Sequence, residues 1–449
     1  MLRNKSQETI QKIKYHAKNL GIFANLETIG SYDDFSQLVV LDYLDEKTFS
    51  QLLSNFQSHA IQDSYESLTR FCSTSVHELT HWLDHTSTLW GQRQLVLIYN
   101  AINAWTNQKE EEFYRIAIAN SERQRARLAI YYTEKYKVNQ QEAATIPWQY
   151  QYGSGLEFGI DGRVKTDRPF VFTIFSTPNN QHIIRVPFSM FALTESNATY
   201  AELNIKIQAL ALLDNDSRLV EKSRLEQEIV QKLYNPELVI YSVATHCLAN
   251  SIGINEIFQS YKFSSALATL CLNLPEDLFY SLTVPQEFNI LEERVQALQE
   301  LADPGFAFFT IAKQAPKFQN GVSVDQWLQE ALKNSGLPNL EKINSLVLAK
   351  MKQLENEILE GIYTEQLRSL LSIGRENFVK RGTWGQNLLS IENLYQTSMI
   401  LPPILLGDGS TAPVVNKTTF TSSQAMEQWI EQIISIEASI EQFICACRL

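Results

Sequence analysis

Cysteine is scarce in this sequence, and the few cysteines do not fit a disulfide framework. There are five in 449 residues, an odd number, and Cys72, Cys247 and Cys271 lie in apolar segments typical of helices. One residue separates Cys445 from Cys447, which is the wrong spacing for a zinc knuckle. We therefore expect reduced thiols rather than disulfides.

Long apolar runs are also missing. No segment approaches the roughly 20 apolar residues that a membrane-spanning helix needs. The first residues are charged and polar, unlike the apolar centre of a signal peptide. The expected location is therefore cytoplasmic, without a membrane partner.

The sequence has fewer basic than acidic residues: 38 Lys and Arg and 50 Asp and Glu, which gives a formal net charge of −12. Such a surface repels phosphate on average, which argues against broad binding to nucleic acid. The sequence also has no glycine-rich phosphate loop. The content of 44% hydrophobic and 11% aromatic residues is typical of a folded globular protein.

Hydrophobic periodicity predicts an α+β fold that is predominantly α-helical. A strand is expected at 37–44, and a β-hairpin at 170–175 and 182–186. A Pro- and Gly-rich break covers 401–410, and an inserted helical hairpin is expected within 92–141. Other helical patterns cover 2–19, 46–90 with a break near 58–63, 190–213, 219–234, 236–250, 256–272, 291–302, 324–334, 339–373 and 422–446.

The segment His77-Glu78-Leu79-Thr80-His81, which we call the HELTH motif, carries the clearest chemical signal. Histidines four residues apart lie on adjacent turns of one helix face, where both can bind one tetrahedral metal ion. Glu78 is rotated about 100° from His77 and can reach a water molecule at such a metal, so we expect it to be the general base. Three of the seven histidines fall within nine residues, at 77, 81 and 85, whereas a solvated helix face more usually carries Lys, Arg and Glu.

Two further polar residues follow the motif on the same polar arc of the helix. The Cα of His85 is about 12 Å along the helix axis from that of His77, too far for three successive histidines to share one ion. His85 is expected to line the cleft, to support a ligand or simply to pack. Asp84 is expected either to hydrogen bond a ligand imidazole or to form a local ion pair, while Val76, Leu79, Leu83 and Trp90 are expected on the opposite, apolar side.

A catalytic zinc ion needs a third protein ligand, and the best source is the helix expected at 190–213. No glycine and histidine follow the motif at the positions of the extended metzincin signature, so a carboxylate is the next candidate. Glu195, Thr199 and Glu202 fall on one stripe of this helix among apolar residues, where a carboxylate needs a partner. Glu195 is favoured as the ligand, and Glu202 is the alternative.

The HELTH motif and the Glu-x-x-Ala pattern at Glu195 and Ala198 resemble the gluzincins, the thermolysin-like class of zinc peptidases. The resemblance implies a zincin-like catalytic region with a small sheet at 1–255, containing a helical insertion at about 92–150. A helical C-terminal region at 256–449 would follow, packed separately or as part of one domain. It also implies one Zn²⁺ ion bound by His77, His81 and Glu195, with Glu78 as the catalytic carboxylate. Thr199 stands where such enzymes often place an aspartate that supports a ligand histidine, so this support must come from another residue.

The expected function is that of a zinc metallopeptidase acting on a peptide or protein substrate. In this mechanism Glu78 takes a proton from water and passes it to the leaving amine. His246 and Tyr200 are weak candidates for stabilising the oxyanion, since each is more often a satisfied core residue. Two alternatives remain open: a zinc amidase or other hydrolase acting on a small molecule, and a helical interaction protein with a vestigial motif.

Overall fold

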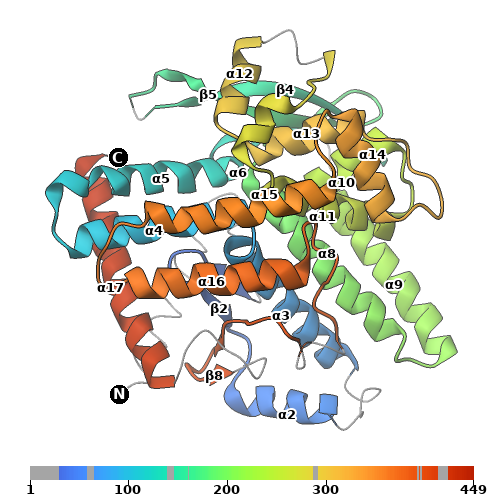
Figure 1. Ribbon diagram of the computed structural model, residues 1–449. Coiled ribbons are helices and arrows are strands. Elements are labelled where there is room, and N and C mark those ends of the chain that lie inside the picture. Colours follow the sequence, from blue (N-terminus) through green and yellow to red (C-terminus); the bar gives the residue numbers. More distant parts are fainter. Residues whose placement is uncertain are drawn as a thin grey trace.

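The computed structural model describes residues 30–57, 65–138, 146–159, 161–286, 292–391, 394, 397–412 and 423–448. Helices dominate this part of the chain and two small sheets accompany them (Figure 1). This arrangement confirms the predominantly helical α+β class. The helix expected at 2–19 lies outside the described residues. Among those described, no helix is long and apolar enough to cross a membrane.

The first sheet joins the N-terminal part of the described chain to its C-terminal part. Its strands lie in the order β1 (Ser31–Asp33), β2 (Leu38–Leu41), β7 (Ile404–Leu406) and β8 (Thr411–Ala412). The β1–β2 and β7–β8 pairs are antiparallel, and β2 pairs with β7 in parallel. The strand expected at 37–44 is confirmed as β2, which is buried throughout. Its parallel partner β7 lies in the segment that was expected only to be a break.

The second sheet contains the expected hairpin. Its strands lie in the order β3 (Glu134–Lys135), β6 (His182–Pro187), β5 (Val164–Ser176) and β4 (Gln149–Phe158), and all neighbours are antiparallel. The sequence analysis did not predict β4. A Cβ atom on Gly153 or Gly155 would lie 2.8 or 2.6 Å from the rings of Phe172 and Phe170, so β4 leaves space for aromatic rings of β5.

Two long helices, α3 (Tyr65–Thr86) and α8 (Met190–Leu210), pack directly against each other at the centre of the molecule. They bring the HELTH motif next to Glu195 although more than 100 residues separate them in the chain. The other helices are α2 (Glu46–Gln57), α4 (Leu89–Thr106), α5 (Tyr114–Ala126), α6 (Leu128–Tyr132), α9 (Asn215–Leu233), α10 (Val239–Ile252), α11 (Ile257–Leu272), α12 (Glu292–Glu300), α13 (Pro304–Gln314), α14 (Val324–Asn334), α15 (Leu340–Gln353), α16 (Thr364–Arg381) and α17 (Ser423–Cys447).

The helix expected at 339–373 is interrupted. It is divided into α15 and α16 by the 3₁₀ turn at Leu354–Glu357 and the segment that follows. In this segment Gly361 lies against α4, since a Cβ at this position would be only 2.5 Å from Asn103 Oδ1. Asn103 also donates a hydrogen bond to the carbonyl of Leu359. The interruption therefore allows the segment between α15 and α16 to pack closely against α4.

The expected hairpin within 92–141 corresponds to α4 and α5, which pack against each other. Most of α4 is buried, and α4 contacts α3, α15 and α16, so this helix belongs to the core. One continuous cluster of buried apolar side chains extends from Phe35 to Ile440 and draws on both regions of the expected division at residue 255. Figure 1 shows α17 crossing α4 and α5 at one side of the molecule. The division into two regions stays a prediction.

Candidate metal centre

Helix α3 presents the two motif histidines on the side that faces α8. Its opposite side is anchored in the core, where Val76, Leu79 and Trp82 are each 0% exposed. His77 and His81 keep 14% and 13% of their side-chain surface exposed. The helical period thus places an apolar side in the core and leaves the imidazoles at the edge of a cleft.

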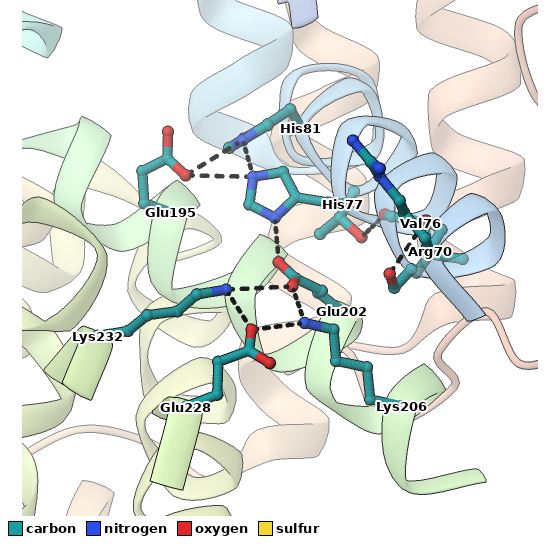
Figure 2. A network of polar contacts seen from close by, with 11 residues as sticks. Arg70, Val76, His77, His81, Glu195, Glu202, Lys206, Glu228 and Lys232 are labelled. Atoms are coloured by element: carbon teal, nitrogen blue, oxygen red, sulfur yellow. Dashed lines mark hydrogen bonds and ion pairs between the residues drawn. The ribbon is translucent and has the colours of Figure 1, made fainter. Parts of the chain in front are cut away.

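Helix α8 supplies a carboxylate between the two imidazoles. Glu195 lies on its second turn and is 5% exposed. Its Oε2 atom is 3.4 Å from His77 Nε2 and 3.4 Å from His81 Nε2, as Figure 2 shows. The two Nε2 atoms are 3.3 Å apart. Three atoms that can bind a metal therefore converge from two helices.

These distances fit a metal site better than a set of hydrogen bonds. Four ligands held tetrahedrally at about 2.0–2.1 Å from a zinc ion lie about 3.3–3.4 Å from one another. The three distances among His77, His81 and Glu195 have this length. The Oε2 atom of Glu195 is also buried and has no hydrogen-bond partner of good geometry among the described residues.

No family model, curated protein or solved structure matches this chain.

The groups of the centre stabilise one another's charges strongly. Burial alone would lower the pKa of His77, but its contacts with Glu195 and Glu202 outweigh burial and raise this pKa well above its usual value. Burial would also lower the pKa of His81, and the charge of Glu195 raises it instead. Burial would raise the pKa of Glu195, yet His81 and His77 lower it to about 2. The carboxylate is thus ionised and the site attracts positive charge, as a cation site must.

Glu202 lies on the other side of the His77 ring. Its Oε2 atom is 3.3 Å from His77 Nδ1, whereas Glu195 faces Nε2 (Figure 2). The two carboxylates that the sequence offered as alternative ligands therefore have different places. Glu195 lies with the converging donors, and Glu202 lies beside Nδ1 in an ion-pair contact that does not have hydrogen-bond geometry. A carboxylate in this place suits the supporting role for which Thr199 has no carboxylate.

Glu202 is itself held by a network of charges. Lys206 Nζ is 2.8 Å from Glu202 Oε1, and Lys232 Nζ is 4.0 Å from the same atom. Both lysines also contact Glu228, at 3.3 and 2.9 Å (Figure 2). The charge of Lys206, followed by contact with His77, overcomes burial and holds the pKa of Glu202 far below its usual range. Glu202 is therefore ionised.

Glu78 follows the first histidine and faces the cleft. It is 8% exposed, and burial raises its pKa above the usual value. Gly30, which precedes β1, lies against it: a Cβ at position 30 would be 2.9 Å from Glu78 Cγ and 3.1 Å from Oε1. The absence of a side chain at position 30 lets β1 approach this carboxylate closely.

Tyr241 is the functional candidate that the sequence analysis missed. It lies in α10, with its ring centroid 6.4 Å from that of His77. The charge of Glu195, together with burial and the charges of Glu78 and Glu202, raises the pKa of Tyr241 well above its usual value. Its hydroxyl group therefore stays protonated and can donate a hydrogen bond. No local pattern distinguishes Tyr241, since only the packing of α10 against α8 brings it to the site.

His246 and Tyr200, the two weak candidates for stabilising the oxyanion, lie away from the metal centre. His246 is 4% exposed, its Nε2 atom is 2.8 Å from the carbonyl oxygen of Leu233, and its ring stacks on Trp148. Tyr200 packs beside a separate small apolar cluster. Neither lines a cavity at the metal centre, so both belong to the packing of the protein.

Asp84 and His85 also have defined places. Asp84 is 0% exposed and contacts α8, the helix that the motif histidines also face. Its ion pair is with Arg381 of α16 at 2.7 Å rather than with a nearby residue, and it accepts a hydrogen bond from Asn197 of α8 at 2.9 Å. His85 Nδ1 is 3.1 Å from the hydroxyl group of Tyr32, and burial lowers the pKa of His85 to about 4.

Two cavities meet at the centre. The first cavity extends toward Tyr32, His85 and Trp90. The prediction for Trp90 was wrong, because this residue lies at the start of α4 and not on the apolar side of α3. The second cavity extends toward Lys206 and Lys232. The residues that line both are Gly30, His77, Glu78 and Tyr241. Of the three converging residues, His77 lines both cavities.

Proposed function

We propose that this protein is a zinc-dependent hydrolase with a zincin-like core, and specifically a metallopeptidase. The observation that carries the proposal is the triangle of His77 Nε2, His81 Nε2 and Glu195 Oε2, with sides of 3.3–3.4 Å. An octahedral site with bonds of the same length would bring neighbouring donors to about 2.9 Å, so the triangle favours tetrahedral zinc. Two histidines and a glutamate leave one position open for chemistry.

A zinc ion bound there would supply the acidity of a water molecule and the polarisation of a carbonyl group. Glu202 supports this function through His77. An imidazole whose Nδ1 proton is held by a carboxylate presents Nε2 in a fixed orientation and with increased basicity.

Glu78 is the residue for proton transfer. It lines both cavities beside the donor atoms and follows the proposed ligand His77 directly in the chain. In the proposed reaction its carboxylate accepts a proton from the attacking water and then delivers this proton to the leaving nitrogen.

Tyr241 is the residue for stabilising the oxyanion. Its protonated hydroxyl group lies in the same buried environment as Glu78, where a hydrogen bond to developing negative charge is stronger than in water.

Replacement of Glu78 by glutamine tests the proposal. We expect Glu78→Gln to keep one zinc ion per chain by elemental analysis and to lose peptide hydrolysis, whereas His77→Ala and His81→Ala lose the metal. Glu226→Gln, at a half-exposed position of α9, is the matched control and should keep both properties. Undiminished hydrolysis by Glu78→Gln would refute the mechanism.

The substrate class is tested with the same proteins. Wild-type enzyme loaded with zinc should cleave members of a mixed peptide library, with products identified by mass spectrometry. Cleavage of small amides without cleavage of peptides would reassign the substrate class. Absence of bound metal after gentle purification and zinc addition would refute the hydrolase.

A further inference from the structure

Two arginines line the first cavity on the side where His85 lies. Arg123 is on the last turns of α5, and Arg127 lies between α5 and α6. Both contact Asp34, the residue that follows β1. Their side chains keep 19% and 22% of their surface exposed, and both residues line the cavity.

The two arginines differ in how completely they are bound. Arg123 holds Asp34 with two hydrogen bonds, from Nη2 at 2.7 Å and from Nε at 3.2 Å, and its guanidinium group lies over the ring of Phe35. Arg127 makes one hydrogen bond, from Nη2 to Asp34 Oδ1 at 2.9 Å. A guanidinium group has five N–H donors, so most of those of Arg127 are without a protein acceptor among the described residues.

Arg127 has less contact with carboxylates than Arg123 has. One carboxylate, Asp34, is shared by both guanidinium groups. Glu437 of α17 lies 3.8 Å from Arg123, and the charge of Asp33 also acts on Arg123. Among the described residues, Arg127 contacts Asp34 and no other carboxylate. Arg127 therefore keeps N–H donors for a ligand at the wall of the cavity.

Arg127 lines the same cavity as the metal centre. His85 follows the ligand His81 by one helical turn, about 6 Å along the axis, and electrostatic interaction links His85 with Asp34 and both arginines. Apolar side chains also line this cavity, among them Trp90, Ile130, Phe191 and Ile240. A ligand that fills the cavity from the metal centre would therefore contact both apolar side chains and the arginines.

We propose that Arg127 binds a carboxylate group of the substrate, with Arg123 and Asp34 holding it in position. The proposal rests on the hydrolase function above and adds a substrate class: peptides with a negative charge on one side of the cleaved bond. The carboxylate is either an acidic side chain or the free C-terminus of the substrate. An arginine fork suits both because it can form two parallel hydrogen bonds with a carboxylate.

Arg123 alone is sufficient for the structural role of holding Asp34 against α5. Its two hydrogen bonds already join Asp34 to α5, and Phe35 packs on its other side. Arg127 adds one hydrogen bond to an acceptor that Arg123 already satisfies. The inference therefore predicts an effect of Arg127 on substrate selection that exceeds its effect on stability.

The first test uses octapeptides with glutamate placed in turn at each position, beside a matched set with glutamine. Each peptide is made with a free and with an amidated C-terminus, which separates the two sources of the carboxylate. We expect wild-type enzyme to have a kcat/KM at least about 10-fold higher for the charged member of one pair. Arg127→Gln should reduce this ratio to less than about 3-fold.

Arg163→Gln is the matched control, because it removes the same charge from a side chain that is 89% exposed. A ratio near one in the wild type, or an unchanged ratio in Arg127→Gln, overturns the inference while leaving the hydrolase in place. Arg127→Lys keeps the charge but not the fork, and should retain an intermediate preference.

The second test measures binding and does not need catalysis. Fluorescently labelled members of the selected peptide pair are titrated into the zinc-loaded Glu78→Gln protein, with and without Arg127→Gln. If no pair is selected because the wild type does not cleave, all pairs are titrated into wild-type protein. Tighter binding of the charged peptide that depends on Arg127 supports the inference even if the hydrolase proposal fails. Equal binding of both peptides overturns it.

Discussion

The substitution Glu202→Gln tests whether Glu202 is a metal ligand or a residue that holds the ligand His77 in position. Glu202 contacts His77 at Nδ1 through a distance of 3.3 Å, on the side of the ring away from the converging donors. Glutamine is nearly isosteric and can still accept the Nδ1 proton through its carbonyl oxygen. It loses the negative charge, and hydrogen bonds that involve an ionised partner are roughly twice as strong as neutral ones.

The expected loss follows from the place of this contact. Residues that orient a ligand histidine typically contribute 10–100-fold to metal affinity, so Glu202→Gln should raise the zinc dissociation constant by about this factor. Glu195→Gln removes a donor atom of the site itself and should raise it further. The order of the two effects distinguishes the ligand from the supporting residue.

The assay is competition between the protein and a fluorescent zinc chelator at fixed pH. Glu228→Gln is the matched control, because Glu228 contacts the same Lys206 and Lys232 but not His77. Circular dichroism should show that all the variants remain folded. A loss for Glu202→Gln no larger than that for Glu228→Gln would refute the positioning role, and a loss larger than that for Glu195→Gln would exchange the two assignments.

Three further predictions concern the tyrosine, the buried ion pair and the raised carboxyl pKa. Tyr241→Phe should lower kcat by about 100-fold or more with zinc content unchanged, and an equal kcat would remove Tyr241 from the mechanism. Arg381→Met leaves Asp84 buried without its cation and should lower the free energy of unfolding, measured in urea, by about 3–5 kcal/mol. The raised pKa of Glu437, about 9 against 4.5, destabilises the folded state progressively as pH rises between these values, because only the unfolded state ionises. Glu437→Gln should therefore gain stability over wild type from pH 5 to 8.5, and a pH-independent difference would contradict this.

The elements with a strong local pattern were predictable. The period of α3 and its apolar side identify the helix, and runs of β-branched and aromatic residues on either side of a turn identify β5 and β6. β4 was missed although residues 149–152 alternate polar and aromatic side chains, because Gly153 and Gly155 interrupt the rest, and these glycines are explained only by the rings of β5. β7 was missed because three residues beside a proline pair have no recognisable period, and its strand pairing with β2 joins residues more than 360 positions apart.

The sequence by itself determined the pair of histidines and the glutamate between them, since helical spacing is a local property and brings residues 77 and 81 to one face wherever the helix lies. The same spacing placed Glu195 and Glu202 on one stripe of α8, but it could not say which one faces the metal donors. Only the packing of α8 against α3 assigned Glu195 to the Nε2 side of His77 and Glu202 to the Nδ1 side. Tyr241 and Arg127 reach the cleft in the same way, through contacts between elements that no local period records.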